Sequence, residues 1–176
     1  VGRLGYTGDG LNQRRAHLHL EVALLWHDQF ASWHPANFSS PNKHGLYNGI
    51  NLIGLDIAGF YLQQRQNPSL TLPQFIRQQQ SFFSVRIPES PHFQLPRRYP
   101  WLVKGNPAGA RSWLVSFTAP GFPVLIEPST EPAPAPRVAW VAPAAFPYTK
   151  LTRGLINGPR DRPRLGESGE KLIDLL

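Results

Sequence analysis

Residues 16–24 read AHLHLEVAL, a run in which apolar and polar side chains alternate. Such alternation is typical of a half-buried β-strand, because successive side chains point to opposite faces of a sheet. Aliphatic residues would form the core face, and two histidines and a glutamate would share the other. The two sets are Leu18, Leu20, Val22 and Leu24, and His17, His19 and Glu21. Because imidazole is a common ligand of zinc, the histidine face is a candidate metal site.

Residues 4–22, LGYTGDGLNQRRAHLHLEV, resemble the last motif of the lysostaphin-type (LytM-like) zinc metallopeptidases, a family of peptidoglycan endopeptidases. In that family a Thr-Gly turn precedes His-Leu-His-Phe-Glu on a strand. This sequence departs from the pattern in two places. Leu20 replaces the aromatic residue, and DGLNQRRA at 9–16 replaces a shorter Gly-Pro approach to the first histidine.

The resemblance implies a zinc metalloendopeptidase that hydrolyses peptide bonds of bacterial peptidoglycan. It implies that His19 is a zinc ligand and that His17 is the catalytic histidine, which hydrogen-bonds the attacking water and steadies the tetrahedral intermediate. The cofactor would be Zn²⁺, the partner a peptidoglycan peptide, and the location the cell envelope, periplasmic or secreted.

The family's remaining ligands, a His-x-x-x-Asp pair, precede this strand, whereas Asp9 is the sole carboxylate before His17. Together with the absence of methionine, this favours a chain that is the C-terminal part of such an enzyme and inactive alone. His27, His34 and His44 follow the motif without ligand spacing.

Two other functions are consistent with the residues. One is a catalytically degenerate module that binds or regulates within the cell envelope. The other is a basic binding domain for wall polymer or nucleic acid, in which the histidine pair is accidental.

The net charge of +7 and a pI near 10.2 suit an acidic partner. The basic residues are dispersed, however, in QRR at 13–15, PRR at 96–98 and RDRPR at 160–164. This pattern favours a solvated basic surface over a specific nucleic-acid site. No apolar run approaches the ~20 residues that span a bilayer, and the sequence leaves the oligomeric state open.

The 19 prolines favour short strands and turns, and the sequence predicts a β-rich α+β fold. An antiparallel, truncated peptidase-type sheet would occupy 1–48, a helical segment 49–90, and a proline-rich, β-containing extension 91–176. A long loop is expected at 26–49, followed by a well-buried helix at 51–66.

A second, shorter helix is expected within 69–80, with Thr71 as its N-cap, Gln74 at the capping-box position and Pro73 in the first turn. Strands are expected at 81–88, 112–119 and 122–128, the last two joined by a turn at Pro120-Gly121. A connector at 129–137 and a closing helix at 169–176, capped by Ser168, complete the prediction. Trp101, Trp113 and Trp140 are expected to pack, although they could also stack on sugar rings.

Overall fold

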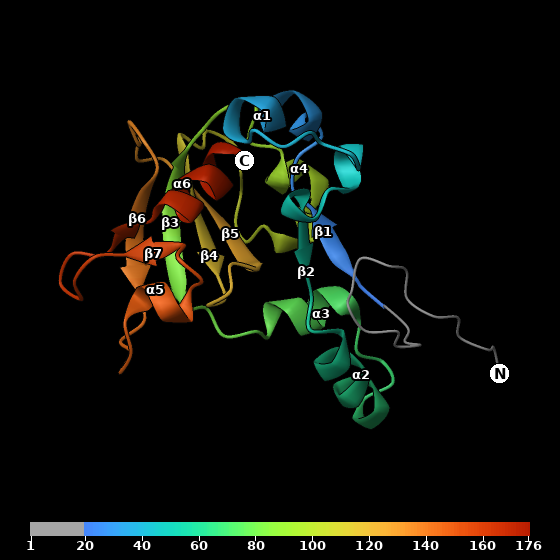
Figure 1. The fold of residues 1–176 in the computed structure, drawn as a ribbon. Coiled ribbons are helices and arrows are strands. Elements are labelled where there is room, and N and C mark those ends of the chain that lie inside the picture. Colours follow the sequence, from blue (N-terminus) through green and yellow to red (C-terminus); the bar gives the residue numbers. More distant parts are fainter. Residues whose placement is uncertain (1–19) are drawn as a thin grey trace.

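The computed structural model describes residues 20–176, which form an α+β fold with antiparallel sheets (Figure 1). The described residues contain six α-helices: α1 (Phe30–Asn37), α2 (Ile57–Gln66), α3 (Leu72–Arg77), α4 (Leu95–Arg98), α5 (Tyr148–Leu151) and α6 (Glu167–Asp174). Three short 3-10 helices are η1 (Gly45–Tyr47), η2 (Gly49–Asn51) and η3 (Pro100–Leu102). In this part of the chain no helix is long and apolar enough to cross a membrane.

The main sheet contains four antiparallel strands in the order β5-β4-β3-β6. They are β3 (Phe83–Pro88), β4 (Ser112–Phe117), β5 (Pro123–Ser129) and β6 (Arg137–Val141). The first three confirm the predicted strands to within two residues. The proline-rich segment 130–136 carries the chain from one outer strand, β5, to the other, β6.

The two faces of the main sheet differ in chemistry. One face is apolar, because Phe83 lies opposite Phe117, Val85 opposite Val115 and Ile87 opposite Trp113, and all six side chains are buried. Phe83 and Phe117 stack with their ring centroids 5.0 Å apart. The other face carries a buried contact between the hydroxyls of Ser84 and Ser116, 2.9 Å apart.

A second, two-stranded sheet pairs β1 (Ala23–Leu25) with β2 (Leu52–Gly54). The sequence predicted a helix from residue 51, so the first part of that prediction was wrong. Leu52–Gly54 are extended because they pair with β1, and Asp56 then begins α2 by accepting a hydrogen bond from Gly59 N at 2.9 Å.

Helix α2 is also less buried than predicted. Only Phe60 of this helix is buried, whereas Tyr61 and Leu62 are 50% and 62% exposed. In Figure 1, α2 lies at the lower edge of the molecule, with the main sheet to one side. Apolar residues on most of the helix surface predicted a well-buried helix, but among residues 20–176 the buried contact of α2 is on the side of Phe60, which packs against Phe75 of α3.

The loop predicted at 26–49 contains helix α1. Phe30 and His34 are buried one turn apart, and their rings lie 5.4 Å from each other. Trp33 and Phe38 extend the same aromatic cluster. The Ser, Pro and Asn residues of this segment favoured a loop, so helix propensity did not predict α1. The aromatic rings at spacings of i, i+3 and i+4 were the pattern that indicated a helix.

The predicted start of α3 is confirmed. Thr71 Oγ1 accepts from Gln74 N, and Gln74 Oε1 accepts from Thr71 N at 2.9 Å, which together form the capping box. The turn between β4 and β5 is confirmed as well, with Gly121 at φ +96° directly after Pro120.

Helix α6 begins earlier than predicted, because Gly166, and not Ser168, is the N-cap, with no side-chain cap. Gly166 N donates to Leu155 O at 2.9 Å, and Gly169 approaches the same backbone so closely that a Cβ would clash. Leu155 directly precedes a small hairpin, which consists of β7 (Ile156–Asn157) and β8 (Arg164–Leu165). Close backbone packing therefore sets the start of this helix.

Candidate functional site

His17 and His19, the predicted catalytic residue and zinc ligand, lie outside the described residues. The described residues begin at Leu20, and of the strand predicted over 16–24 the structure shows only its end, because β1 begins at Ala23 and residues 20–22 precede it without strand pairing. Glu21 is exposed and Leu24 is buried, as the alternation predicts for the two faces. Leu20, predicted on the core face, is instead 56% exposed, so the core face of this segment begins further along the chain.

Strand β1 is held on both of its edges. On one edge it pairs with β2, with Leu24 opposite Ile53. On the other edge the hydroxyl of Tyr99 accepts from Leu25 N at 2.8 Å and donates to Leu25 O at 3.0 Å. A single side chain thereby satisfies two backbone groups that would otherwise lack partners at the end of an edge strand.

The residues just after β1 are fixed by the buried side chain of Asn51. Its Oδ1 accepts from His27 N at 2.9 Å, and its Nδ2 donates to His27 O at 2.8 Å and to Leu46 O at 3.0 Å. The position and direction of the strand that follows the histidine pair therefore depend on Asn51 and Tyr99.

His27 is a structural residue. Its Nδ1 accepts from Gln29 N at 2.9 Å, which places the ring proton on Nε2, and Nε2 donates to His92 O at 3.0 Å. With both ring nitrogens engaged and the side chain 5% exposed, His27 has no lone pair to offer a metal.

The other possible metal ligands named from the sequence, His34, His44 and Asp28, have separate environments. His34 is buried within the aromatic cluster of α1, stacked on Phe38, and His44 is exposed beside η1. Asp28 forms an ion pair with Arg98 at 2.5 Å, and this hydrogen bond lowers the pKa of the Asp28 carboxyl. Between residues 20 and 176 no group of three or more His, Asp or Glu residues could hold a metal ion.

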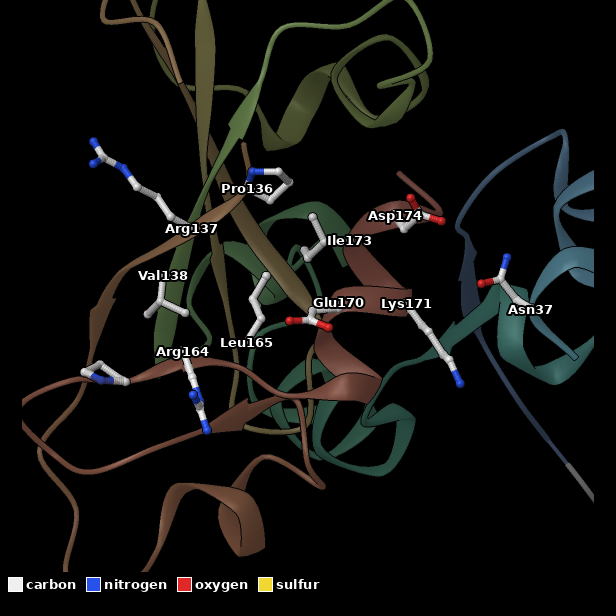
Figure 2. Close-up of a pocket in the computed structure, with 11 residues that line it drawn as sticks. Asn37, Pro136, Arg137, Val138, Arg164, Leu165, Glu170, Lys171, Ile173 and Asp174 are labelled. Atoms are coloured by element: carbon white, nitrogen blue, oxygen red, sulfur yellow. The ribbon is translucent and has the colours of Figure 1, made fainter. Parts of the chain in front are cut away.

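The structure reveals a cavity of about 610 Å³ that the sequence did not predict. Figure 2 shows it between the start of β6, strand β8, helix α6 and the end of α1. Its apolar lining comes from Val138, Leu165 and Ile173. A volume of this size is within the range of sites that bind small molecules.

Charged side chains surround this apolar lining. Arg137, Arg164 and Glu170 form no ion pair or side-chain hydrogen bond with any other residue of the described chain. Lys171 and Asp174 are engaged: Lys171 Nζ lies 2.9 Å from Glu167 Oε1, and Trp33 Nε1 donates to Asp174 Oδ2 at 2.8 Å. These two arginines and Glu170 lie around the apolar lining, and Figure 2 shows the guanidinium groups of Arg137 and Arg164 pointing in different directions.

Trp101, Trp113 and Trp140 differ in how far their side chains are buried. Trp113 is buried on the apolar face of the sheet and lies 5.9 Å from the ring of Phe93, so it is a packing residue as predicted. Trp101 is half-buried beside Tyr99. Trp140 differs, because 47% of it is exposed on the outer strand β6.

Comparison with known proteins adds no assignment: no protein-family model, no curated protein and no solved structure matches the chain.

Proposed function

We propose that this chain contributes His17 and His19 to the site of a zinc metalloendopeptidase that hydrolyses peptide bonds in the peptidoglycan of the bacterial envelope. The observation that carries the proposal is the motif TGDGLNQRRAHLHLE at residues 7–21, with its two alternating histidines. Periplasmic or secreted location, a peptidase-type sheet and a peptidoglycan peptide as substrate belong to the same proposal.

The surroundings of the motif support it. Two residues after the exposed Glu21 the chain enters strand β1 (Ala23–Leu25), in which Leu24 is buried. In the sequence pattern His17 and His19 alternate with Leu18 and Leu20, and on a strand both imidazoles would share one face. Tyr99 and Asn51 hold the end of β1 and the residue pair after it by hydrogen bonds to Leu25 and His27.

The chemistry divides between the two histidines. Zinc, when bound, supplies a Lewis acid that activates water and polarises the scissile carbonyl. His19 would help to hold the metal. His17 would orient the attacking water by a hydrogen bond and then stabilise the charge that develops on the carbonyl oxygen. By the family resemblance, the other ligands would be a His-x-x-x-Asp pair that precedes this strand.

A degenerate envelope-binding module is the second candidate, and it is favoured by Arg137 and Arg164 at the cavity, which pair with no acidic residue among residues 20–176. Zinc content separates the two functions. The full-length protein, read from the gene upstream of Val1, should contain one His-x-x-x-Asp pair and bind zinc in a stoichiometric amount. A protein without that pair and without zinc would overturn the enzymatic proposal.

Single substitutions test the roles of the histidines in the full-length protein. His19→Ala should abolish zinc binding and hydrolysis of a soluble cross-linked peptide, whereas His17→Ala should abolish hydrolysis and retain zinc. His44→Ala is the matched control, because His44 is exposed, and it should change neither. Retention of zinc and activity by His19→Ala would contradict the assignment.

A further inference from the structure

The outer strand β6 is an open edge of the main sheet. Its ladder partner is β3, and no other residue of the described chain bonds the backbone of Arg137–Val141. Because the backbone groups of an antiparallel strand point alternately to its two sides, β6 presents N–H and C=O groups on its outer side that no described residue pairs. The strand is also accessible, since Arg137, Ala139 and Trp140 are exposed.

The opposite edge of the sheet, β5, is closed. Val103 forms a parallel bridge with Ile126, and Lys104 N donates to Ile126 O at 2.9 Å. Strand β5 also contains Pro123 and Pro128, which have no N–H to donate. Of the two edges, β6 is therefore the one on which another strand can be added.

Two recesses lie along β6. Val138 lines the cavity of about 610 Å³, and Val141 lines a second hollow of about 550 Å³. Ala139 has no partner on β3, so the two valines lie opposite Val85 and Phe83, which are two residues apart on β3. Side chains on one face of a strand are also two residues apart. A strand added beside β6 would therefore bring alternate side chains to the two recesses.

Positive charge is concentrated on the same side of the molecule. Residues 137–164 contain six Lys and Arg residues but a single acidic residue, Asp161, and so carry +5 of the net charge of +7. Strand β6 contacts β8, and α5 contacts β7, so the elements of this segment lie together (Figure 1). All six basic side chains are exposed, and none forms an ion pair within the described chain: Arg137, Lys150, Arg153, Arg160, Arg162 and Arg164. The charge favours an acidic partner.

The same charge disfavours two other occupants of the edge. A second copy of the chain would bring another +5 to the contact, and the like charges would repel each other. Residues 1–19 contain three arginines and one aspartate, so this segment is basic as well.

The open strand edge favours a peptide over a nucleic acid. The backbone phosphates of a nucleic acid are acidic, but they only accept hydrogen bonds, whereas the outer side of a strand presents donors and acceptors in turn. An extended peptide carries both kinds of group at the spacing of β6, and its alternate side chains match the two recesses.

We propose that the outer edge of β6 binds an extended acidic segment of a partner protein, which adds a strand to the main sheet. Apolar side chains at alternate positions of that segment enter the two recesses, and its Asp or Glu residues lie among the basic side chains of residues 137–164. Neither His17 nor His19 takes part, so this contact goes beyond the proposed peptidase activity and does not depend on it.

The test measures, by fluorescence anisotropy, the binding of a short labelled peptide in which glutamate and valine alternate to the full-length protein. A peptide with lysine in place of glutamate tests the charge, and an oligothymidylate tests the class of ligand. The acidic peptide should bind at least about tenfold more tightly than either.

N-methylation of the peptide tests strand pairing, because it removes N–H donors without changing charge or side chains. In a strand added to β6, the N–H groups of alternate residues face the sheet. Methylating either all valines or all glutamates should therefore weaken binding at least about tenfold, and methylating the other set should weaken it less than about threefold. Hydrogen exchange locates the contact: the acidic peptide should slow exchange in residues 137–141 and leave residues 123–129 unchanged.

Charge reversal tests the surface on the protein. Arg137→Glu with Arg164→Glu, on β6 and β8, should weaken binding of the acidic peptide at least about tenfold. Lys43→Glu with Arg65→Glu, at exposed positions before η1 and on α2, changes the net charge equally and should change binding less than about threefold.

Four results would overturn the proposal. They are equal losses in the two double variants, equal effects of the two methylated peptides, and tighter binding of the lysine peptide or of oligothymidylate. A dimer of the protein that the acidic peptide dissociates would also overturn it, because β6 would then pair with a second copy.

Discussion

Asn51 bonds both backbone groups of His27, accepting from its N–H at 2.9 Å and donating to its carbonyl at 2.8 Å. The amide thereby continues the pairing of β1 with β2 beyond the last ladder residue, Leu25. A third bond, to Leu46 O, ties the same side chain to η1. One fully buried polar residue thus connects three segments that precede the main sheet.

Asn51→Ala should be strongly destabilising. The substitution removes three hydrogen bonds and leaves buried backbone groups without partners, so we expect the free energy of unfolding to fall by roughly 2–4 kcal/mol. Urea denaturation followed by tryptophan fluorescence measures the change. Asn67→Ala is the control, because among the described residues the Asn67 side chain bonds only Ser69, in an exposed turn. A loss for Asn51→Ala no larger than the control's would contradict the role described.

Tyr99→Phe should destabilise the protein by about 1–2 kcal/mol, because it removes the hydroxyl that bonds Leu25 N and O and leaves the ring in place. Tyr61→Phe, at a half-exposed position on α2, should be close to neutral. Hydrogen exchange at the amide of Leu25 gives a local readout, and it should accelerate in Tyr99→Phe alone.

The same hydroxyl predicts a dependence on alkaline pH. Burial raises the pKa of Tyr99 above its ordinary value, so the folded state favours the neutral phenol. The associated stability is fully present below the pKa of an unfolded tyrosine, about 10, and is lost as the pH rises through the higher folded value. The difference in stability between wild type and Tyr99→Phe should therefore shrink in urea titrations above pH ~10. A difference that grows with pH would contradict this sign.

Gly121→Ala should destabilise more than Gly109→Ala. Both glycines have positive φ, +96° and +74°, and so share the backbone strain of about 1 kcal/mol. A Cβ at Gly121 would also strike the side chain of Leu155, whereas a Cβ at Gly109 would meet open space. We expect an excess loss of about 1–3 kcal/mol at Gly121 in thermal or urea unfolding. Equal losses would mean that Leu155 moves aside freely.

Phe60→Ala should cost about 2–4 kcal/mol, because Phe60 is 9% exposed and packs edge-on against Phe75 at 5.5 Å. Leu62→Ala on the same helix should be within about 0.5 kcal/mol of wild type, since that side chain is 62% exposed. Urea denaturation of the two variants checks whether α2 packs on one side only. Similar losses in the two variants would instead support the sequence-based prediction of a well-buried helix.

The correct predictions from sequence came from local signals. The capping box of Thr71 and Gln74, the Pro120-Gly121 turn and the three strands β3, β4 and β5 depend on residues close together in the chain. The incorrect predictions concern residues whose structure depends on partners far away in the sequence. Leu52–Gly54 are extended because they pair with β1, and α6 begins at Gly166–Glu167 because Gly166 meets Leu155.

The two candidate sites also differ in whether their residues are close together in the sequence. The histidine pair was visible because its residues alternate within one short run, although its role stays a prediction. The cavity at Arg137, Arg164 and Glu170 was not visible, since it is assembled from segments separated by loops and by the β7–β8 hairpin. The excess of Lys and Arg over residues 137–164 would have indicated a basic segment, but not the cavity.

The indole of Trp26 donates to Leu172 O at 2.9 Å across 146 residues of sequence, and Trp33 reaches Asp174 across 141. This pairing has a consequence for the timing of synthesis. At ribosomal rates of ~5–20 residues per second, roughly 7–30 seconds separate the making of Trp26 from the making of its partner. During that interval the aromatic residues of α1 lack the cover that α6 provides, so the nascent chain is exposed to chaperones and proteases until α6 has been made.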